Sequence, residues 1–145
     1  MQKIYFHSAD RAFHFNSKNP LKSFIQRIFL LEKQNLETLH YIFCSDDYLL
    51  QINKDFLHHD YYTDIITFNL SDTSKIIEGE VYISFDRVKE NALLQKTGYK
   101  EECLRVIFHG ALHLCGYKDK TKKEIIRMRE KENEYLHLYL KTNPI

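Results

Sequence analysis

The chain has 145 residues, a length that predicts one domain, residues 1–145, with a single hydrophobic core. Its residues are 43% hydrophobic and 28% charged, an ordinary globular composition that excludes a fibrous or largely disordered chain. No apolar run approaches the roughly 20 residues that span a membrane, and the N-terminus lacks the apolar segment of a signal peptide. We therefore expect a cytoplasmic protein without membrane partners. The net charge of +1 is only a weak indication of its partners.

The three cysteines, Cys44, Cys103 and Cys115, are odd in number and lack C-x-x-C spacing. This pattern predicts reduced thiols rather than a disulfide framework.

The first half of the chain alternates predicted strands and helices. Residues 4–6 and 13–15 are predicted as short strands, and Pro20 opens a helix whose apolar positions repeat with the helical period. Apolar residues at every second position predict a strand at 39–43. Ser45 can cap the helix that follows.

The second half predicts two more strands and three helices. The strands lie near 65–70 and 80–84, and a helix from Asp86 is predicted to end at Gly98. A strongly apolar helix then runs from about residue 100 to 115, and a capping box at Thr121 opens the last helix. The whole is predicted to be one compact α+β domain, a small mixed sheet packed with about five helices.

The apolar helix carries the strongest functional signal. His109 and His113 are four residues apart and therefore lie on one face of the helix. Gly116 can end this helix, so that the chain turns back with a carboxylate at Asp119. One metal ion could accept His109, His113 and Asp119 at the end of this central helix. It would keep a position open for water, as catalytic metal sites do.

A histidine pair at this spacing also arises by chance, and two hydrogen-bonded core histidines are the alternative interpretation. The surrounding helix is strongly apolar, and burying two imidazoles there is costly unless a partner satisfies them. The glycine stop and the oxygen ligand beyond it favour the metal site. Cys115 lies away from the face of His109 and His113, and we expect it to be a small packing residue.

The segment resembles the signature of the YbeY family of bacterial endoribonucleases, which are rRNA maturation factors with the pattern H-G-x-L-H-L-x-G-Y-D-H. The matching residues are His109, Gly110, Leu112, His113, Leu114, Gly116 and Tyr117.

Three other segments also resemble the family. YTDIITF at residues 62–68 resembles its P-T-D-V-L-S-F strand, and GEVYIS at 79–84 resembles its G-D-I-x-I-S strand. Asn53 stands where the family has its L-N-x-x-[FYW]-R helix end. Order and spacing agree over roughly residues 40–120.

The chain departs from the family pattern at two places. Asp119 stands where the family has its third histidine, after Lys118 in place of an aspartate. Leu57 stands where the family has an arginine thought to handle RNA or phosphate charge. His58 and His59 follow and could partly substitute, although an imidazole is not a bidentate guanidinium.

The resemblance implies a single-strand-specific endoribonuclease that acts in maturation of the 16S rRNA 3′ end and in ribosome quality control, with the small ribosomal subunit as partner. One zinc ion, held by the three ligands, would lower the pKa of its bound water and polarise a phosphoryl oxygen. Gly110 occupies the position of the glutamate base in H-E-x-x-H proteases, which argues against peptide hydrolysis. Glu80 and Asp64 are the candidate catalytic bases.

Basic residues gather just after the proposed metal helix. Residues 118–129 are rich in lysine and arginine, and a basic rim beside a hydrolytic metal would suit RNA. Each lysine taken singly is equally well explained as part of a solvated helix face. The predicted RNA-binding residues are Lys118, Lys120, Lys122, Lys123, His58 and His59.

Two other functions fit the same sequence. A ribosome-assembly binding factor would keep the metal as a structural element and have little nuclease activity, which Leu57 favours. A different metal enzyme is the second alternative, because two histidines and one carboxylate also suit ferrous iron, manganese or nickel.

Overall fold

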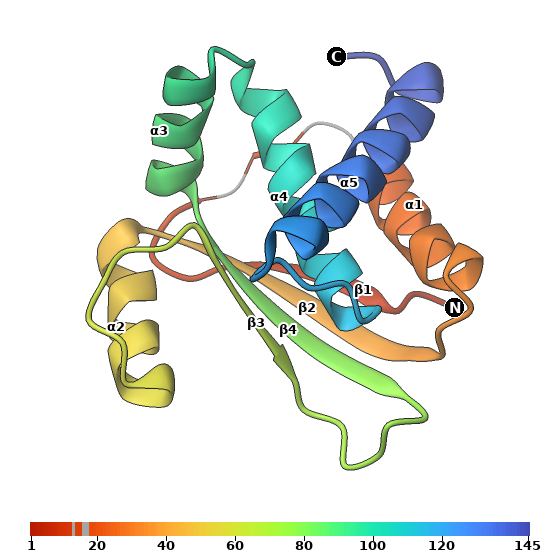
Figure 1. Cartoon of the computed structure of the whole chain (residues 1–145), viewed down its shortest axis with the longest axis horizontal. Coiled ribbons are helices and arrows are strands. Elements are labelled where there is room, and N and C mark those ends of the chain that lie inside the picture. Colours follow the sequence, from red (N-terminus) through yellow and green to blue (C-terminus); the bar gives the residue numbers. More distant parts are fainter. Residues whose placement is uncertain (13, 16–17) are drawn as a thin grey trace.

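The computed structural model describes residues 1–12, 14–15 and 18–145. In this part of the chain a four-stranded mixed sheet has the order β1-β2-β4-β3 (Figure 1). Parallel pairs join β1 to β2 and β2 to β4, whereas β3 runs antiparallel to β4 at one edge. The strands are β1 (Ile4–Ser8), β2 (Leu36–Cys44), β3 (Ile65–Asn69) and β4 (Ile77–Ser84).

Five helices complete the described chain, and the predicted α+β class is confirmed. Ser45 caps α2 through its side chain, and Thr121 and Glu124 form the predicted capping box of α5. None of these helices combines the length and apolar composition that a membrane crossing requires. The helices are α1 (Lys18–Leu31), α2 (Asp46–Leu57), α3 (Phe85–Gln95), α4 (Tyr99–Leu114) and α5 (Lys122–Thr142).

Two local predictions need correction. No strand forms at 13–15: Phe13 lies outside the described residues, and His14 and Phe15 belong to no strand. Helix α3 ends at Gln95 rather than at Gly98, because Lys96 itself takes the left-handed conformation, at φ 56°, and donates its N–H to Ala92 and Leu93. Gly98 instead stands at the N-cap of α4, at φ −69°.

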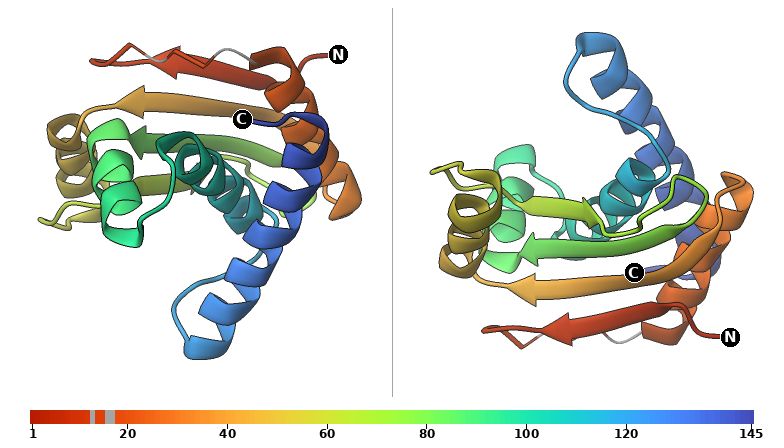
Figure 2. Two further views of the ribbon diagram at one scale, coloured as in Figure 1. Left: turned by 90° about the horizontal axis from the view of Figure 1, so that it is seen from above. Right: turned by 90° about the horizontal axis from the view of Figure 1, so that it is seen from below.

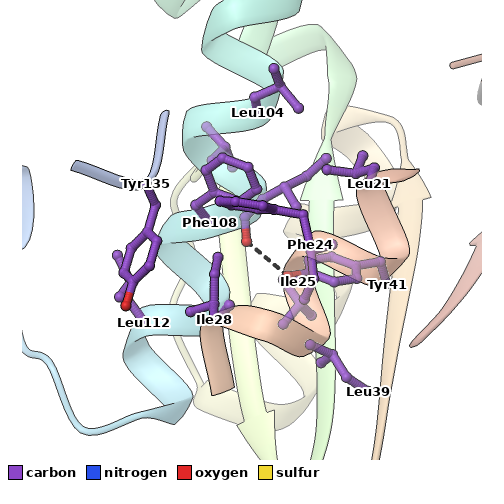
Figure 3. Close-up of a cluster of buried hydrophobic side chains, with 14 of the residues drawn as sticks. Leu21, Phe24, Ile25, Ile28, Leu39, Tyr41, Leu104, Phe108, Leu112 and Tyr135 are labelled. Carbon is purple, nitrogen blue, oxygen red and sulfur yellow. Dashed lines mark hydrogen bonds between the residues drawn. The ribbon is translucent and has the colours of Figure 1, made fainter. Parts of the chain in front are cut away.

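Four helices, α1, α3, α4 and α5, cover one face of the sheet, and α2 packs on the other face near one end (Figure 2). The main core lies between α1, α4, α5 and the sheet (Figure 3). Within it the buried Tyr41 of β2 donates its hydroxyl to the carbonyl of Ile107 in α4, over 2.8 Å. This bond satisfies a polar group deep in the core and ties α4 to the central strands.

Glycine permits an unusually close contact between α4 and the sheet. A Cβ at Gly110 would lie 2.9 Å from Cγ1 of Val81 and 3.1 Å from Cδ1 of Ile65. A Cβ at Gly79 of β4 would likewise lie 2.6 Å from Cδ1 of Leu114. A glutamate at position 110 would therefore force the side chains of Val81 and Ile65 to shift, so the close contact disfavours an acidic base there.

The predicted stop of α4 at Gly116 is confirmed, and it has the geometry of a Schellman motif. Gly116 has a φ of 106° and donates its N–H to the carbonyl of His113, over 3.0 Å. Tyr117 donates its N–H to the carbonyl of Leu112, over 3.1 Å. The chain therefore reverses sharply and enters residues 115–121, the connection that leads to α5.

A partly buried carboxylate holds this connection against two helices. Glu32, just after α1, accepts a hydrogen bond from the hydroxyl of Tyr117 over 2.7 Å and another from the hydroxyl of Tyr135 in α5. The ammonium group of Lys131 lies 3.1 Å from the same carboxylate. Burial raises the pKa of Glu32, but the bonds from Tyr135, Tyr117 and Lys131 outweigh it, so the pKa is lowered overall.

Glu32→Gln should destabilise the fold by about 1–3 kcal/mol at neutral pH, because the buried Lys131 loses the less exposed of its two carboxylate partners and keeps only the exposed Glu134. Since the folded pKa of Glu32 is lowered, its contribution is present above the ordinary value of 4.5 and disappears as the pH falls through the folded pKa. Urea unfolding at pH 7 and at several values between 5 and 3 measures this. The difference in the free energy of unfolding between Glu32→Gln and the parent protein should become smaller as the pH falls. Glu130→Gln, on an exposed surface pair, is the control. A difference independent of pH would contradict the assignment.

Candidate metal centre and substrate cavity

The three predicted metal ligands converge. His109 and His113 project from the last turns of α4, and Asp119 comes from the connection to α5. Oδ2 of Asp119 lies 3.2 Å from Nε2 of His109 and 3.3 Å from Nε2 of His113. One ligand atom from each residue lies within 4.8 Å of the others, so the group could hold a single metal ion.

A buried carboxylate that the sequence did not reveal orients the first ligand. Nδ1 of His109 lies 2.6 Å from Oε2 of Glu132 in α5, and Glu132 is only 5% exposed. Nδ1 therefore carries the hydrogen and donates it, which leaves the lone pair of Nε2 for a metal. Glu132 is itself held by Arg105, at 3.2 Å, and Arg129, at 3.4 Å.

The charges around His109 favour its protonation, so metal binding there should depend on pH. Burial lowers the pKa of His109, but the hydrogen bond and charge of Glu132, with Asp119 and Asp64, outweigh it and raise the pKa overall. Burial raises the pKa of Glu132, but the bonds and charges of His109 and Arg105 lower it overall. Because a protonated imidazole cannot bind a metal, occupancy of the site should fall in acid.

The donor set fits a catalytic metal better than a closed structural one. Two imidazole nitrogens and one carboxylate oxygen form the three-ligand pattern of catalytic zinc, and the same set suits other divalent transition ions. The side chains of His109, His113 and Asp119 are 18%, 28% and 39% exposed, so the group faces solvent on one side.

That side opens into a cavity of about 810 Å³, within the range typical of ligand sites. Its walls come from α4, the α4–α5 connection, the first half of α5, the end of α3, strand β3, the last turns of α2 and the α2–β3 connection (residues 58–64). Five residues of α4 at helical spacing form one wall: Glu102, Arg105, Val106, His109 and His113.

The two candidate catalytic bases lie on opposite faces of the sheet. Asp64 lines the cavity, and its Oδ2 accepts a hydrogen bond from Asn91 over 3.2 Å. Burial raises its pKa, which the nearby His109 only partly offsets. Glu80 alternates with the buried Gly79 and Val81, so its side chain points away from α4, where it accepts from the hydroxyl of Tyr82 over 3.0 Å. The structure therefore does not bring Glu80 to the site.

The predicted RNA-binding residues are also separated. Lys120 and His59 line the cavity. Lys118 and Lys123 instead line a smaller hollow beside Tyr117 and Arg127. Among the described lining residues of these two spaces, neither Lys122 nor His58 is found, and His58 serves as the left-handed C-cap of α2.

Several cavity residues were not predicted from the sequence. Arg129 lines the cavity from α5, and Tyr61 lines it from the α2–β3 connection. Glu102 is 3% exposed, and its Oε2 has no hydrogen-bond partner in the described part of the chain. The i, i+3 spacing of Arg129 and Glu132 predicts that the two side chains share one face of a helix. The sequence around them does not show that this face lies beside His109.

Comparison with known proteins agrees with this geometry. The sequence profile of the family described as Endoribonuclease YbeY matches residues 5–140. The chain is similar to the Endoribonuclease YbeY of Cytophaga hutchinsonii, with 50% identity over 94% of this chain and 96% of the relative. With the protein of that name from Flavobacterium psychrophilum it shares 42% identity over 88% and 90%.

A solved structure shows the same fold. The solution structure of TM1509 from Thermotoga maritima superposes with a TM-score of 0.60 and 26% identity, covering 97% of this chain and 93% of that one. The family profile, the fold and the sequence identity over nearly the whole length agree, and the chain therefore belongs to the YbeY endoribonuclease family.

Proposed function

We propose that this protein is a zinc-dependent endoribonuclease that cuts single-stranded RNA, acting in the cytoplasm on the 3′ end of 16S rRNA within the small ribosomal subunit and in ribosome quality control. The observation that carries the proposal is the group of His109, His113 and Asp119, oriented by Glu132 and open to a cavity. The family name supports the endoribonuclease activity. The metal, the rRNA target and the ribosomal partner are our inference.

A bound metal would supply a more acidic water and a Lewis acid for the phosphoryl group. The chain supplies the remaining functions. Glu132 fixes the ring of His109, and Asp64 is the carboxylate that accepts a proton in the cavity. A base works best when its pKa lies near the working pH, and burial moves the pKa of Asp64 upward in that direction.

Exposed cations allow RNA to enter a cavity that also contains carboxylates. Asp64, Glu102, Asp119 and Glu132 line it, and these groups alone would repel a phosphate. Arg105 is 13% exposed and engaged with Glu132 and Asn133. Arg129, 48% exposed, and the exposed Lys120 are therefore the cations that can reach an RNA phosphate.

The first prediction from the proposed function concerns the metal. The purified protein should bind about one zinc equivalent, and His109→Ala or Asp119→Ala should lose most of it because each removes a ligand. Glu132→Gln should weaken binding by about 10–100-fold, since the orienting carboxylate is lost. Competition against a chromophoric chelator measures these affinities. His137→Ala, an exposed histidine of α5, is the control. Unchanged affinity in Asp119→Ala would remove Asp119 from the site.

The second prediction concerns the base. Asp64→Asn should lower kcat on single-stranded RNA by about 10²–10⁴-fold while metal content and KM change little. Glu80→Gln should leave kcat unchanged, because Glu80 faces the other side of the sheet. Cleavage of a labelled oligonucleotide under steady-state conditions gives kcat and KM. Equal losses in the two variants would show that the effect is not local to the cavity.

The third prediction concerns the cations. Lys120→Gln with Arg129→Gln should weaken RNA binding and reduce the slope of log K against log salt by about 0.7 per lost phosphate contact. Lys141→Gln, near the far end of α5, should change neither quantity. Titrations at four or more salt concentrations provide the slopes. If the slopes of the double variant and the parent coincide, these two residues do not contact phosphate.

A ribosome-assembly binding factor with a structural metal is the second candidate. Leu57 lines the cavity without contributing a charge, and this observation favours the alternative. Incubation of the zinc-loaded protein with an RNA carrying the 16S 3′ end separates the two functions, with His109→Ala as the inactive control. Binding without any cleavage above that control would favour the binding factor.

A further inference from the structure

The wall of the cavity contributed by the α2–β3 connection carries a rigid aromatic pair. The rings of His59 and Tyr61 stack with centroids 5.1 Å apart and planes 26° from parallel. The hydroxyl of Tyr61 lies 3.0 Å from Nδ1 of His59. Both residues line the cavity, and Tyr61 is 55% exposed, so a large aromatic surface is held in water at its edge.

A buried amide fixes this pair in place. Asn53 of α2 is 1% exposed, and its Nδ2 donates to the carbonyl of Tyr61 over 2.9 Å. The carbonyl of Asn53 accepts the N–H of His59 over 3.1 Å. One residue of α2 therefore holds the backbone of both aromatic residues, and a ligand that stacks there would not have to order the loop.

The neighbouring tyrosine has a different role. Tyr62 does not line the cavity in the described structure: its ring lies 5.2 Å from the guanidinium of Arg87, and its hydroxyl donates to Asp47 over 3.3 Å. Tyr61 and Tyr62 thus differ in surroundings although they are adjacent, which makes Tyr62 a matched control.

We propose that Tyr61, backed by His59, is the subsite that stacks an unpaired nucleotide base next to the scissile phosphate. This rests on the proposed function, because it assumes that the cavity takes RNA. The candidate metal ligands, Arg129 and Lys120 come from α4, α5 and the connection between them, the aromatic pair comes from the α2–β3 connection, and all of them line the same cavity. If a phosphate binds beside the candidate metal ligands and these cations, its flanking base could reach the ring of Tyr61.

The chemistry of the subsite selects single strands. An unpaired base presents a whole π face to an aromatic ring, whereas a base in a helix is already stacked on its neighbours. Stacking on a protein aromatic ring tolerates any base, so the subsite would favour unpaired RNA without reading its sequence.

The test is an abasic scan of the intact zinc-loaded protein. A fluorescein-labelled single-stranded DNA hexamer, which an endoribonuclease leaves uncut, carries one abasic site that is moved from position to position. Anisotropy should show one sensitive position with affinity lower by about 5–150-fold, as expected for one stacked base. Tyr61→Ala should lower the affinity for the intact hexamer by a similar factor and give a flat scan. Tyr61→Phe and Tyr62→Ala should keep the parent scan.

The outcomes separate this proposal from the proposed function. A flat scan in the parent protein, or an unchanged scan in Tyr61→Ala, overturns the subsite even if RNA is cleaved. A sensitive position that disappears only in Tyr61→Ala supports the subsite even if the parent protein proves unable to cleave RNA. In a cleavage assay the subsite also predicts that Tyr61→Ala loses much of the preference for single-stranded over double-stranded RNA, while its zinc content stays at the parent value.

Discussion

Helix α4 lies so close to the sheet that a Cβ at Gly110 would come within 2.9 Å of Val81 on β4, while Gly79 on the same strand leaves room for the side chain of Leu114. This contact fixes the rotation of the helix. Its apolar face, with Ile107, Phe108 and Ala111, is then buried against the sheet and α1, and the stripe that carries the histidines faces the cavity. The same contact disfavours a carboxylate at position 110, and with glycine there a base for hydrolysis would come from elsewhere in the fold.

Helix α5 positions the candidate metal ligands from two sides. Glu132 orients His109, and Lys131 and Tyr135 bind Glu32, which also holds Tyr117 two residues before Asp119. The third ligand therefore depends on contacts between α1, the α4–α5 connection and α5, segments far apart in the sequence. Because a metal would bind only this assembled arrangement, its binding would also stabilise the packing of α1 and α5.

Local signals predicted the parts of the site that lie within one turn of chain. The spacing of His109 and His113, the stop at Gly116 and the cap at Thr121 each follow from backbone geometry over a few residues. To choose between Asp64 and Glu80, one must know which face of the sheet α4 covers. Helices pack on both faces, so apolar residues occur on both, and the alternation of residues along the strands does not identify the face that α4 covers. Glu132 is 23 residues from His109, so only tertiary packing reveals the pair.

The two departures from the family pattern, Asp119 and Leu57, both reduce the positive charge available in the cavity. A carboxylate ligand at Asp119 cancels one unit of the positive charge that a metal would bring, and Leu57 adds no cation to the cavity it lines. In the proposed function, attraction for a phosphate would then come from other residues. Arg129, which is half-exposed and anchored by Gln95 and Glu132, is placed to provide it together with Lys120. A cavity whose exposed cations come from α5 and its N-terminal flank, and whose aromatic surface comes from the α2–β3 connection, would hold the backbone of one strand through the first group and one of its bases through the second.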